Sequence, residues 1–336
     1  MTSNQIKAIV CAKYGSPDGL KLEEIQKPTP GDNEVLVKVQ ASSVNYNNLG
    51  MVRGKPFLAR LMGVGLLKPK HKIPGSDIAG RVEAVGKNIK QFEPGDEVFG
   101  ELSWGAFAEY VCVPETALSL KPVNLSFGEA AAVPEASLVA LQGLRDKGQI
   151  RPGQKVLIYG ASGGNGTFAV QIAKSFGAEV TGVCSTRNLG LVRSIGADHV
   201  IDYTQEDFTK NGEHYDLILA TSGYRSIFDY KRALSPNGIY VVTGGTMRGP
   251  KAMAQIYQAL LLGPLISMTG KKKFCILTLN INQKDLLFIK GLIEAGKVKP
   301  VIDRRYQLNE AADALRYYEE GHTRGKVVIT VEHNNT

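Results

Sequence analysis

The first part of the chain alternates short apolar runs with turn residues. Five runs are rich in β-branched and other apolar residues, and Gly-Asp and Pro-Gly pairs separate them. They predict strands at residues 6–12, 34–41, 78–85, 97–99 and 108–113. The pattern is typical of a compact β-rich domain. Residues 53–72 mix apolar and basic side chains, which predicts either a short helix over a cleft or a surface excursion.

From residue 125 onward the hydrophobic pattern changes to alternating strands and helices. Apolar runs predict strands at residues 156–159, 179–184, 199–201, 217–220, 238–243 and 275–279, with helices between them. A helix at residues 167–176 would place five residues on one apolar face: Phe168, Ala169, Ile172, Ala173 and Phe176. This alternation predicts βαβ units and therefore a doubly wound parallel sheet.

After residue 280 the pattern predicts two further helix and strand pairs. They fall at residues 284–295, 301–306, 310–320 and 327–331. These elements could complete the N-terminal β-rich domain. We therefore predict an α/β fold in which a parallel-sheet domain is inserted into a β-rich domain. The inserted domain would span residues 125–280, and the β-rich domain residues 1–124 and 281–336.

Composition narrows the class of protein. The chain has 336 residues, 43% of them hydrophobic, which is enough for two domains with separate cores. The formal net charge of +8 gives a mild preference for anionic ligands, but the charges are well mixed and no motif indicates a nucleic-acid partner. No signal-peptide pattern and no apolar run of roughly 18 residues occurs, so we expect a cytoplasmic protein without a membrane partner. Four widely separated cysteines predict neither disulfides nor a structural zinc lobe.

A glycine-rich turn follows the predicted strand at residues 156–159. It contains Ala161-x-Gly163-x-x-Gly166, a variant of the G-x-G-x-x-G pattern, between a strand and a helix. The missing Cβ of Gly163 lets a pyrophosphate approach, Gly166 lets the helix lie near the strand, and the helix amides face the anion. The turn predicts a dinucleotide site, and the alternative is a turn that serves helix packing alone. The predicted site residues are Ala161, Ser162, Gly163, Gly164, Asn165 and Gly166.

The end of the next strand, Cys184-Ser185-Thr186-Arg187, indicates which dinucleotide binds. An acidic residue there would accept the ribose hydroxyls of NAD and repel a phosphate. This chain instead offers two hydroxyls and a guanidinium, which can hold a 2′-phosphate through two hydrogen bonds. Ser185 and Arg187 therefore predict NADPH rather than NADH. In the alternative, Arg187 is a surface residue at the start of the next helix.

Longer motifs cover nearly the whole chain. They are ASSVNYNNLGMVRG (41–54), PGSDIAGRVEAVG (74–86), PGDEVFG (94–100), VLIYGASGGNG (156–166) and GADHVIDY (196–203). With these motifs the chain resembles the zinc-free, quinone oxidoreductase-like branch of the medium-chain dehydrogenase/reductase superfamily. The resemblance implies a GroES-like catalytic domain, a Rossmann cofactor domain and a cleft between them. It also implies a homodimer joined through the strand at 275–279.

The resemblance assigns roles to individual residues. Asn45 and Tyr46 would lie near the nicotinamide and the substrate, and Tyr203 near the adenine or the 2′-phosphate. Contacts to the nicotinamide ribose or carboxamide would come from Thr243, Gly244, Gly245 and Thr246. The zinc-dependent branch has a cysteine and a His-Glu pair where this chain reads Val-Asn-Tyr-Asn-Asn (44–48) and Gly-Ser-Asp (75–77). Neither stretch offers a soft ligand for catalytic zinc, so we expect no metal.

These residues predict a reductase. Without a Lewis acid, hydride transfer to an already activated acceptor is favoured over alcohol oxidation. We predict NADPH-dependent reduction of an activated C=C bond or a quinone, with an enone, alkenal, quinone or enoyl thioester as the small-molecule substrate. The enolate that forms needs hydrogen-bond donors, for which Asn48 is a candidate. Tyr46 either delivers the proton or packs in the cleft.

Two alternatives stay open. SVNYNN is similar to a stretch of crotonyl-CoA carboxylase/reductases, which hold carbon dioxide with an Asn and a Glu, so Asn45 or Asn48 with Glu135 could form part of such a pocket. Basic residues flank apolar Phe57, Leu58, Leu61 and Met62 and could bind a CoA thioester: Lys55, Arg60, Lys68, Lys70 and Lys72. The protein would then be an enoyl-CoA reductase with a possible CO2-fixing side activity. The second alternative is a crystallin-like protein that binds NADPH without turnover.

Overall fold

The computed structural model describes residues 4–55, 57, 60, 65–245 and 254–333. Among the predicted features, Thr246 and the apolar residues Leu58, Leu61 and Met62 lie outside the described residues. The described part of the chain contains no helix with the length and apolar character that crossing a membrane requires.

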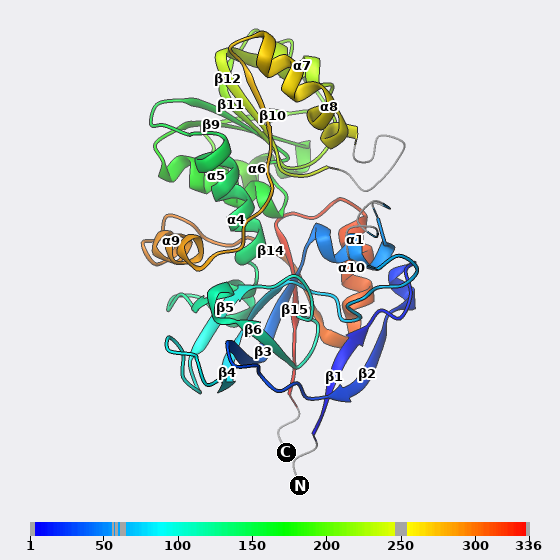
Figure 1. Cartoon of the computed structure of the whole chain (residues 1–336). Coiled ribbons are helices and arrows are strands. Elements are labelled where there is room, and N and C mark those ends of the chain that lie inside the picture. The colour runs from blue at the N-terminus through cyan, green and yellow to red at the C-terminus, as the bar shows by residue number, and fades with distance from the viewer. Residues whose placement is uncertain (1–3, 56, 58–59, 61–64, 246–253, 334–336) are drawn as a thin grey trace.

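A six-stranded sheet forms the upper half of the molecule (Figure 1). Neighbouring strands are parallel throughout, so the predicted doubly wound sheet is confirmed. The strand order is β10 (His199–Asp202), β9 (Glu179–Cys184), β8 (Lys155–Tyr159), β11 (Tyr215–Ala220), β12 (Leu234–Val242) and β13 (Lys273–Ile276). Each corresponds to a predicted strand, although β12 begins four residues before the predicted 238 and β13 begins and ends earlier than the predicted 275–279.

Helices cover both faces of this sheet because successive strand residues belong to two different cores. Val156 and Ile158 pack with helices α4 (Pro134–Gln142), α5 (Gly164–Ser175), α6 (Leu189–Ser194) and α9 (Gln283–Glu294). Leu157 and Tyr159 pack with α7 (Ile227–Ala233) and α8 (Ala254–Thr269). The predicted apolar face of α5 is buried, with Phe168 and Ile172 at 0% exposure.

A second sheet forms the lower half and joins distant parts of the chain (Figure 1). Its order is β14 (Ile302–Gln307), β15 (Lys326–Thr330), β3 (Glu34–Val44), β4 (Asp77–Val85), β5 (Glu97–Glu101) and β7 (Leu118–Leu120), and β6 (Tyr110–Pro114) also pairs with β3. The late strand β15 lies antiparallel to the early strand β3. The sheet therefore unites N-terminal and C-terminal segments, while the exact boundaries of the two predicted domains stay a prediction.

Several short elements were not predicted from the apolar pattern. They are strand β2 (Lys21–Gln26), strand β7, and helices α1 (Tyr46–Arg53) and α3 (Phe127–Ala131). Strand β2 pairs with β1 (Gln5–Val10), which corresponds to the predicted strand at 6–12. Helix α10 (Ala311–Glu319) agrees with the prediction, and single turns lie at η1 (Pro17–Gly19), η3 (Glu115–Ala117), η4 (Gly143–Lys147), η5 (Thr186–Asn188) and η6 (Leu308–Glu310). The residues at the two ends of helix α1 stabilise it, and its sequence has no strong apolar periodicity. Asn45 and Asn48 form a capping box, and Gly54 ends the helix at φ 61°.

Candidate active site

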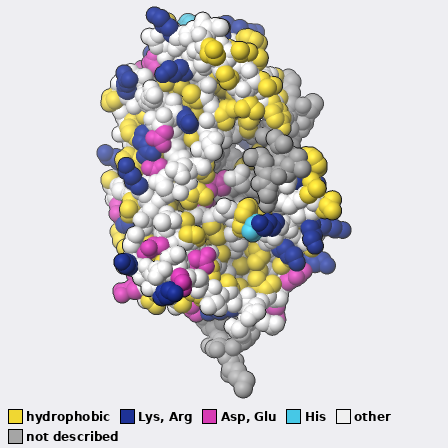
Figure 2. Space-filling model, in the orientation of Figure 1, with side chains coloured by type: hydrophobic (Ala, Val, Ile, Leu, Met, Phe, Trp, Pro, Cys, Tyr) yellow, Lys and Arg dark blue, Asp and Glu magenta, His cyan; other side chains and the backbone are white. Residues whose placement is uncertain are grey.

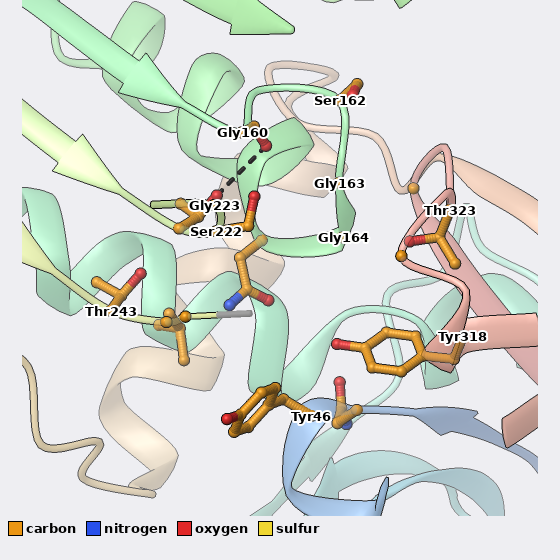
Figure 3. Close-up of a pocket in the computed structure, with 18 of the residues that line it drawn as sticks. Tyr46, Gly160, Ser162, Gly163, Gly164, Ser222, Gly223, Thr243, Tyr318 and Thr323 are labelled. Carbon is orange, nitrogen blue, oxygen red and sulfur yellow. Dashed lines mark hydrogen bonds between the residues drawn. The ribbon is translucent and has the colours of Figure 1, made fainter. Parts of the chain in front are cut away.

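A cavity of about 640 Å³ lies between the two sheets. The glycine turn and the carboxyl ends of β8, β9, β11 and β12 line one side, and the start of α1 and the segment after α10 line the other. Figure 3 shows the turn at Gly160, Ser162, Gly163 and Gly164 across the cavity from Tyr46 and Tyr318. The carboxyl edge of a parallel sheet is where dinucleotides bind in doubly wound folds.

The glycine turn has the shape that a dinucleotide requires. A Cβ on Gly166 would lie 2.1 Å from the carbonyl oxygen of Gly160, so only glycine allows the helix to approach the turn. A Cβ on Gly163 would meet only that same oxygen at 3.6 Å, so its absence keeps the space before α5 open to the cavity. Ser162, Gly163, Gly164 and Asn165 line the cavity, while Ala161 is fully buried. The residues present fit a bound nicotinamide dinucleotide.

The far end of the cavity is formed by residues that follow β9 and β10. Ser185, Arg187 and Tyr203, which the sequence predicts as cofactor-binding residues, line it. Arg187 also donates one hydrogen bond, of 3.0 Å, to the backbone oxygen of His322 in the segment after α10. Sequence reasoning missed Asn188, whose Nδ2 donates to Ser162 Oγ at 2.9 Å and so ties this end to the glycine turn.

Thr186 and Asp202 form a hydrogen-bonded pair beside this end of the cavity. Thr186 Oγ1 donates to Asp202 Oδ2 at 2.5 Å, so this hydroxyl is directed at the carboxylate rather than at the cavity. Thr204 donates to Asp202 Oδ1 through both its backbone nitrogen and its hydroxyl. These hydrogen bonds, with that of Thr186 first, lower the pKa of Asp202. The carboxylate is therefore satisfied locally, and Asp202 does not line the cavity.

The opposite end has the loops that follow β11 and β12. Thr243, Gly244 and Gly245, to which the resemblance assigns nicotinamide contacts, line the cavity. The loop after β11 was not predicted and contributes Thr221, Ser222 and Gly223 (Figure 3). Thr221 Oγ1 donates to the carbonyl oxygen of Gly160 at 3.3 Å. The signal for this loop was its place at the carboxyl end of a parallel strand.

Asn45 and Asn47 line the cavity, and the capping box of α1 keeps Asn48 away from it. Asn48 Oδ1 accepts from the backbone nitrogen of Asn45 at 2.8 Å, and its Nδ2 donates to Ser76 Oγ at 3.1 Å. Asn48 is thus buried in the helix start and does not line the cavity. Asn47, which sequence reasoning did not single out, does line it, and its Nδ2 donates to Glu135 Oε1 at 3.3 Å.

A buried lysine lies among the residues that replace the ligands of the zinc-dependent branch. Lys326 Nζ donates to Asn45 Oδ1 and lies 3.4 Å from Asp77 Oδ2. The side chain of Lys326 is 3% exposed and that of Asp77 is 0% exposed. Asn45 Nδ2 donates to the same Asp77 oxygen at 2.8 Å and to Ser76 Oγ at 3.1 Å. An amide, a hydroxyl and a carboxylate already paired with an ammonium do not fit a catalytic zinc. The described residues contain no group of three or more His, Cys, Asp or Glu that could hold a metal.

Glu135 connects this buried cluster to the cavity. Its Oε2 accepts from Ser76 Oγ at 3.0 Å, and its backbone nitrogen donates to Asp77 Oδ1 at 2.9 Å. Burial, followed by the charge of Asp77, raises the pKa of Glu135 to about 7. Close to neutral pH this carboxyl can therefore both hold and release a proton.

Two tyrosines complete the wall around Glu135. Tyr46 and Tyr318 both line the cavity, and sequence reasoning identified only Tyr46. Burial raises the pKa of each hydroxyl, and the charge of Glu135 raises that of Tyr318 further. Both hydroxyls therefore stay protonated at neutral pH and can donate hydrogen bonds.

The fold and the site define an oxidoreductase that uses a nicotinamide cofactor. The family model for the alcohol dehydrogenase GroES-like domain matches residues 31–123, and the model described as zinc-binding dehydrogenase matches residues 195–329. The chain belongs to the medium-chain dehydrogenase/reductase superfamily, in its quinone oxidoreductase-like branch.

Individual relatives agree with this family. A chloroplastic quinone oxidoreductase of Triphysaria versicolor is 32% identical over 98% of this chain and 99% of its own. A chloroplastic NADPH-dependent alkenal/one oxidoreductase of Arabidopsis thaliana is 33% identical over 97% of this chain and 79% of its own. The solved structure of the quinone oxidoreductase from Coxiella burnetii has a TM-score of 0.83 and 29% identity, covering 98% of this chain and 100% of that one.

Proposed function

We propose that the protein uses NADPH to reduce an activated C=C bond or a quinone without a metal. The observation that carries the proposal is the single cavity that joins the glycine turn to Tyr46, Asn47 and Glu135. Relatives named as quinone and alkenal/one oxidoreductases support this class of acceptor. The donor set around Lys326 supports a reaction that needs no Lewis acid.

The preference for NADPH rests on the far end of the cavity. Ser185 and Arg187 present a hydroxyl and a guanidinium there, and the carboxylate of Asp202 is engaged by Thr186 and Thr204. Arginine binds phosphate through paired charge-assisted hydrogen bonds. A 2′-phosphate would therefore meet a cation, and the hydrogen bonds that Asp202 accepts keep its carboxylate directed away from the cavity.

The residues around Glu135 have distinct tasks in this proposal. When bound, the cofactor supplies a hydride to the β-carbon of the acceptor. Asn47 and the Tyr46 hydroxyl donate hydrogen bonds to the carbonyl oxygen, where negative charge develops. Glu135 gives its proton to the α-carbon and is reprotonated from water, so that one hydride and one proton are added in total. Asn48 and Asn45 act by positioning α1 and Lys326.

Rates of NADPH and NADH oxidation test the proposal. The acceptors are a simple enone, a quinone and crotonyl-CoA, and the variant is Arg187→Ala. Loss of a charged hydrogen bond is worth about 1.5–3 kcal/mol, so KM for NADPH should rise by about 10- to 100-fold while KM for NADH changes little. Arg193→Ala, an exposed arginine on the neighbouring helix α6, is the control and should leave both values unchanged. An equal loss with both cofactors would contradict the phosphate assignment.

The same assay separates the competing functions. A strong preference for crotonyl-CoA would support the enoyl-CoA reductase alternative and call for a test of bicarbonate dependence with Glu135. Tight NADPH binding without reduction of any acceptor would support the crystallin-like alternative. Reduction of the enone or the quinone supports the function proposed here.

We also propose a homodimer, as the resemblance implied. Strand β13 is an edge strand of the parallel sheet, and α8 packs against it. Helix α8 exposes a row of apolar residues, and Figure 2 shows hydrophobic side chains gathered over this part of the surface. The row contains Tyr257, Leu260, Leu261, Leu265 and Met268, each 45–83% exposed. Apolar patches of this kind mark interaction surfaces. The cytoplasmic location stays a prediction.

A further inference from the structure

A second chamber, of about 340 Å³, adjoins the cofactor cavity. The two share Tyr46, Asn47 and Leu279, so a substrate placed beside the cofactor can extend from one into the other. Most of the chamber wall is apolar or aromatic, and two cations belong to it. These lining residues are Met51, Leu102, Trp104, Ile281, Lys55 and Arg60.

The wall of this chamber contains a buried carboxyl, one of whose oxygens has no hydrogen-bond partner among the described residues. Glu101 is the last residue of β5, where it pairs with Asp77 of β4, and its side chain is 3% exposed. It lines the chamber, and its Oε2 has no hydrogen-bond partner among the described residues. An unsatisfied buried polar atom is costly, so such an atom at a cavity wall points to a ligand that satisfies it.

The surrounding charges determine the form of this carboxyl. Glu135 on α4 and Asp77 on β4 face it with negative charge, and the ammonium of Lys326 on β15 acts against them. Burial first, and then the charges of Glu135 and Asp77, raise the pKa of Glu101 to about 10. At neutral pH Glu101 therefore offers an O–H donor rather than a negative charge.

We propose that Glu101 recognises the substrate by donating its O–H to a second carbonyl oxygen, on the opposite side of the C=C bond from the carbonyl group that becomes the enolate. The substrate class is then a quinone or an ene-dione, which carries two carbonyl groups, rather than a simple enone or alkenal. The apolar wall suits such a ring or chain. Lys55 and Arg60 disfavour a cationic ligand, which a carboxyl group would otherwise bind. This inference rests on the proposed function, because it assumes that an activated C=C bond is reduced in the adjoining cofactor cavity.

Paired substrates and paired variants test this role. Cyclohex-2-ene-1,4-dione carries the second carbonyl, and cyclohex-2-enone lacks it. Glu101→Leu should lower kcat/KM for the ene-dione by about tenfold, as the loss of one buried hydrogen bond implies, and change the enone value little. Glu101→Gln keeps a neutral donor and should retain most of the activity with the ene-dione. Glu97→Gln, at the other end of β5 and ion-paired with Arg81, is the control and should resemble the wild type.

Two kinetic outcomes would overturn the inference. If Glu101→Gln loses as much as Glu101→Leu, a neutral N–H donor does not replace the carboxyl, and hydrogen-bond donation by Glu101 is not what binds the second carbonyl. If Glu101→Leu leaves both substrates unaffected, the chamber does not receive the second carbonyl. Unchanged NADPH affinity in each variant would show that a loss arises in the chamber rather than in the cofactor cavity.

Infrared spectroscopy gives a measurement that needs no turnover. The wild type should show a carboxylic-acid C=O band at neutral pH that Glu101→Gln lacks. Cyclohexane-1,4-dione, which cannot be reduced at a C=C bond, should shift this band when NADP+ is present. If no acceptor is reduced but the band shifts, the proposed function fails and the recognition role stands. If reduction occurs but the band is absent or does not shift, the recognition role fails alone.

Discussion

Lys326 compensates the negative charge of its buried neighbours, so its removal should lower the free energy of unfolding. In Lys326→Met the ammonium is lost from a site in which Asp77 is 0% exposed. Asp77 keeps hydrogen bonds from Ser43, Asn45 and the backbone of Glu135, at 2.7, 2.8 and 2.9 Å. Removing one partner of a buried ion pair costs about 3–5 kcal/mol, and these three donors favour the lower end of that range. We expect a loss of about 3 kcal/mol in the free energy of unfolding at pH 7.

The loss should depend on pH with a definite sign. Lys326 lowers the pKa of Glu101 and of Glu135, so without the ammonium both values rise further in the folded protein, while the unfolded values stay near the usual ~4. A carboxyl whose pKa is higher in the folded state binds more protons there, so stability decreases as pH rises above the unfolded pKa. Each additional proton retained makes the loss grow by about 1.4 kcal/mol per pH unit. The variant should therefore be closest to the wild type near pH 5 and furthest from it near pH 8.

Urea unfolding followed by circular dichroism at pH 5, 6.5 and 8 measures both effects. Lys155→Met removes an exposed lysine that pairs with Glu213 at 3.1 Å, and should change stability by less than about 1 kcal/mol at every pH. Adding Asp77→Asn to Lys326→Met should recover part of the loss, because the uncompensated charge is gone. A stability loss below 1 kcal/mol, or one that shrinks as pH rises, would refute this account of the cluster.

Two further predictions concern packing and assembly. Gly166→Ala should destabilise the protein by about 1–3 kcal/mol and weaken NADPH binding, because the added Cβ would lie 2.1 Å from a backbone oxygen. The control is Gly190→Ala on α6, whose Cβ would meet nothing within 4 Å and which should be neutral or stabilising. Urea unfolding and NADPH fluorescence titration measure both variants, and equal effects would contradict the close-approach argument. Light scattering should give a mass twice the chain mass of 36.3 kDa. The double variant Leu261→Glu/Met268→Glu on α8 should give the mass of one chain, whereas the control Leu287→Glu on α9 should leave the dimer intact. A wild-type protein with the mass of one chain would contradict the dimer proposal.

Local sequence patterns predicted the parallel sheet and the cofactor half of the cavity. The glycine turn, its strand and its helix are contiguous, so their chemistry and their geometry come from the same short stretch. Ser185 and Tyr203 follow strands of that sheet, and the carboxyl ends of parallel strands meet at one edge. These contacts need no knowledge of distant pairing.

The substrate half could not be predicted in the same way. Asn47 and Asn48 are neighbours, but the helix start at Tyr46 turns one toward the cavity and commits the other to capping. Lys326 and Glu101 carry no motif, and each becomes part of the site only through strand pairing, β15 with β3 and β5 with β4. Their altered chemistry arises from burial and from neighbouring charges, which a pattern of residue types along the chain does not reveal.

The pairing of β15 with β3 also sets the order in which the site can form during synthesis. Lys326 and Val44 are 282 residues apart, and Gly325 donates its backbone N–H to Ser162 of the glycine turn at 2.9 Å. A ribosome therefore releases the whole parallel sheet before the segment that closes the cavity exists. Until then the edge of β3 that pairs with β15 is unpaired, and chaperones would have to protect this exposed edge from aggregation. The cluster around Lys326 can thus assemble only when nearly the entire described chain has emerged.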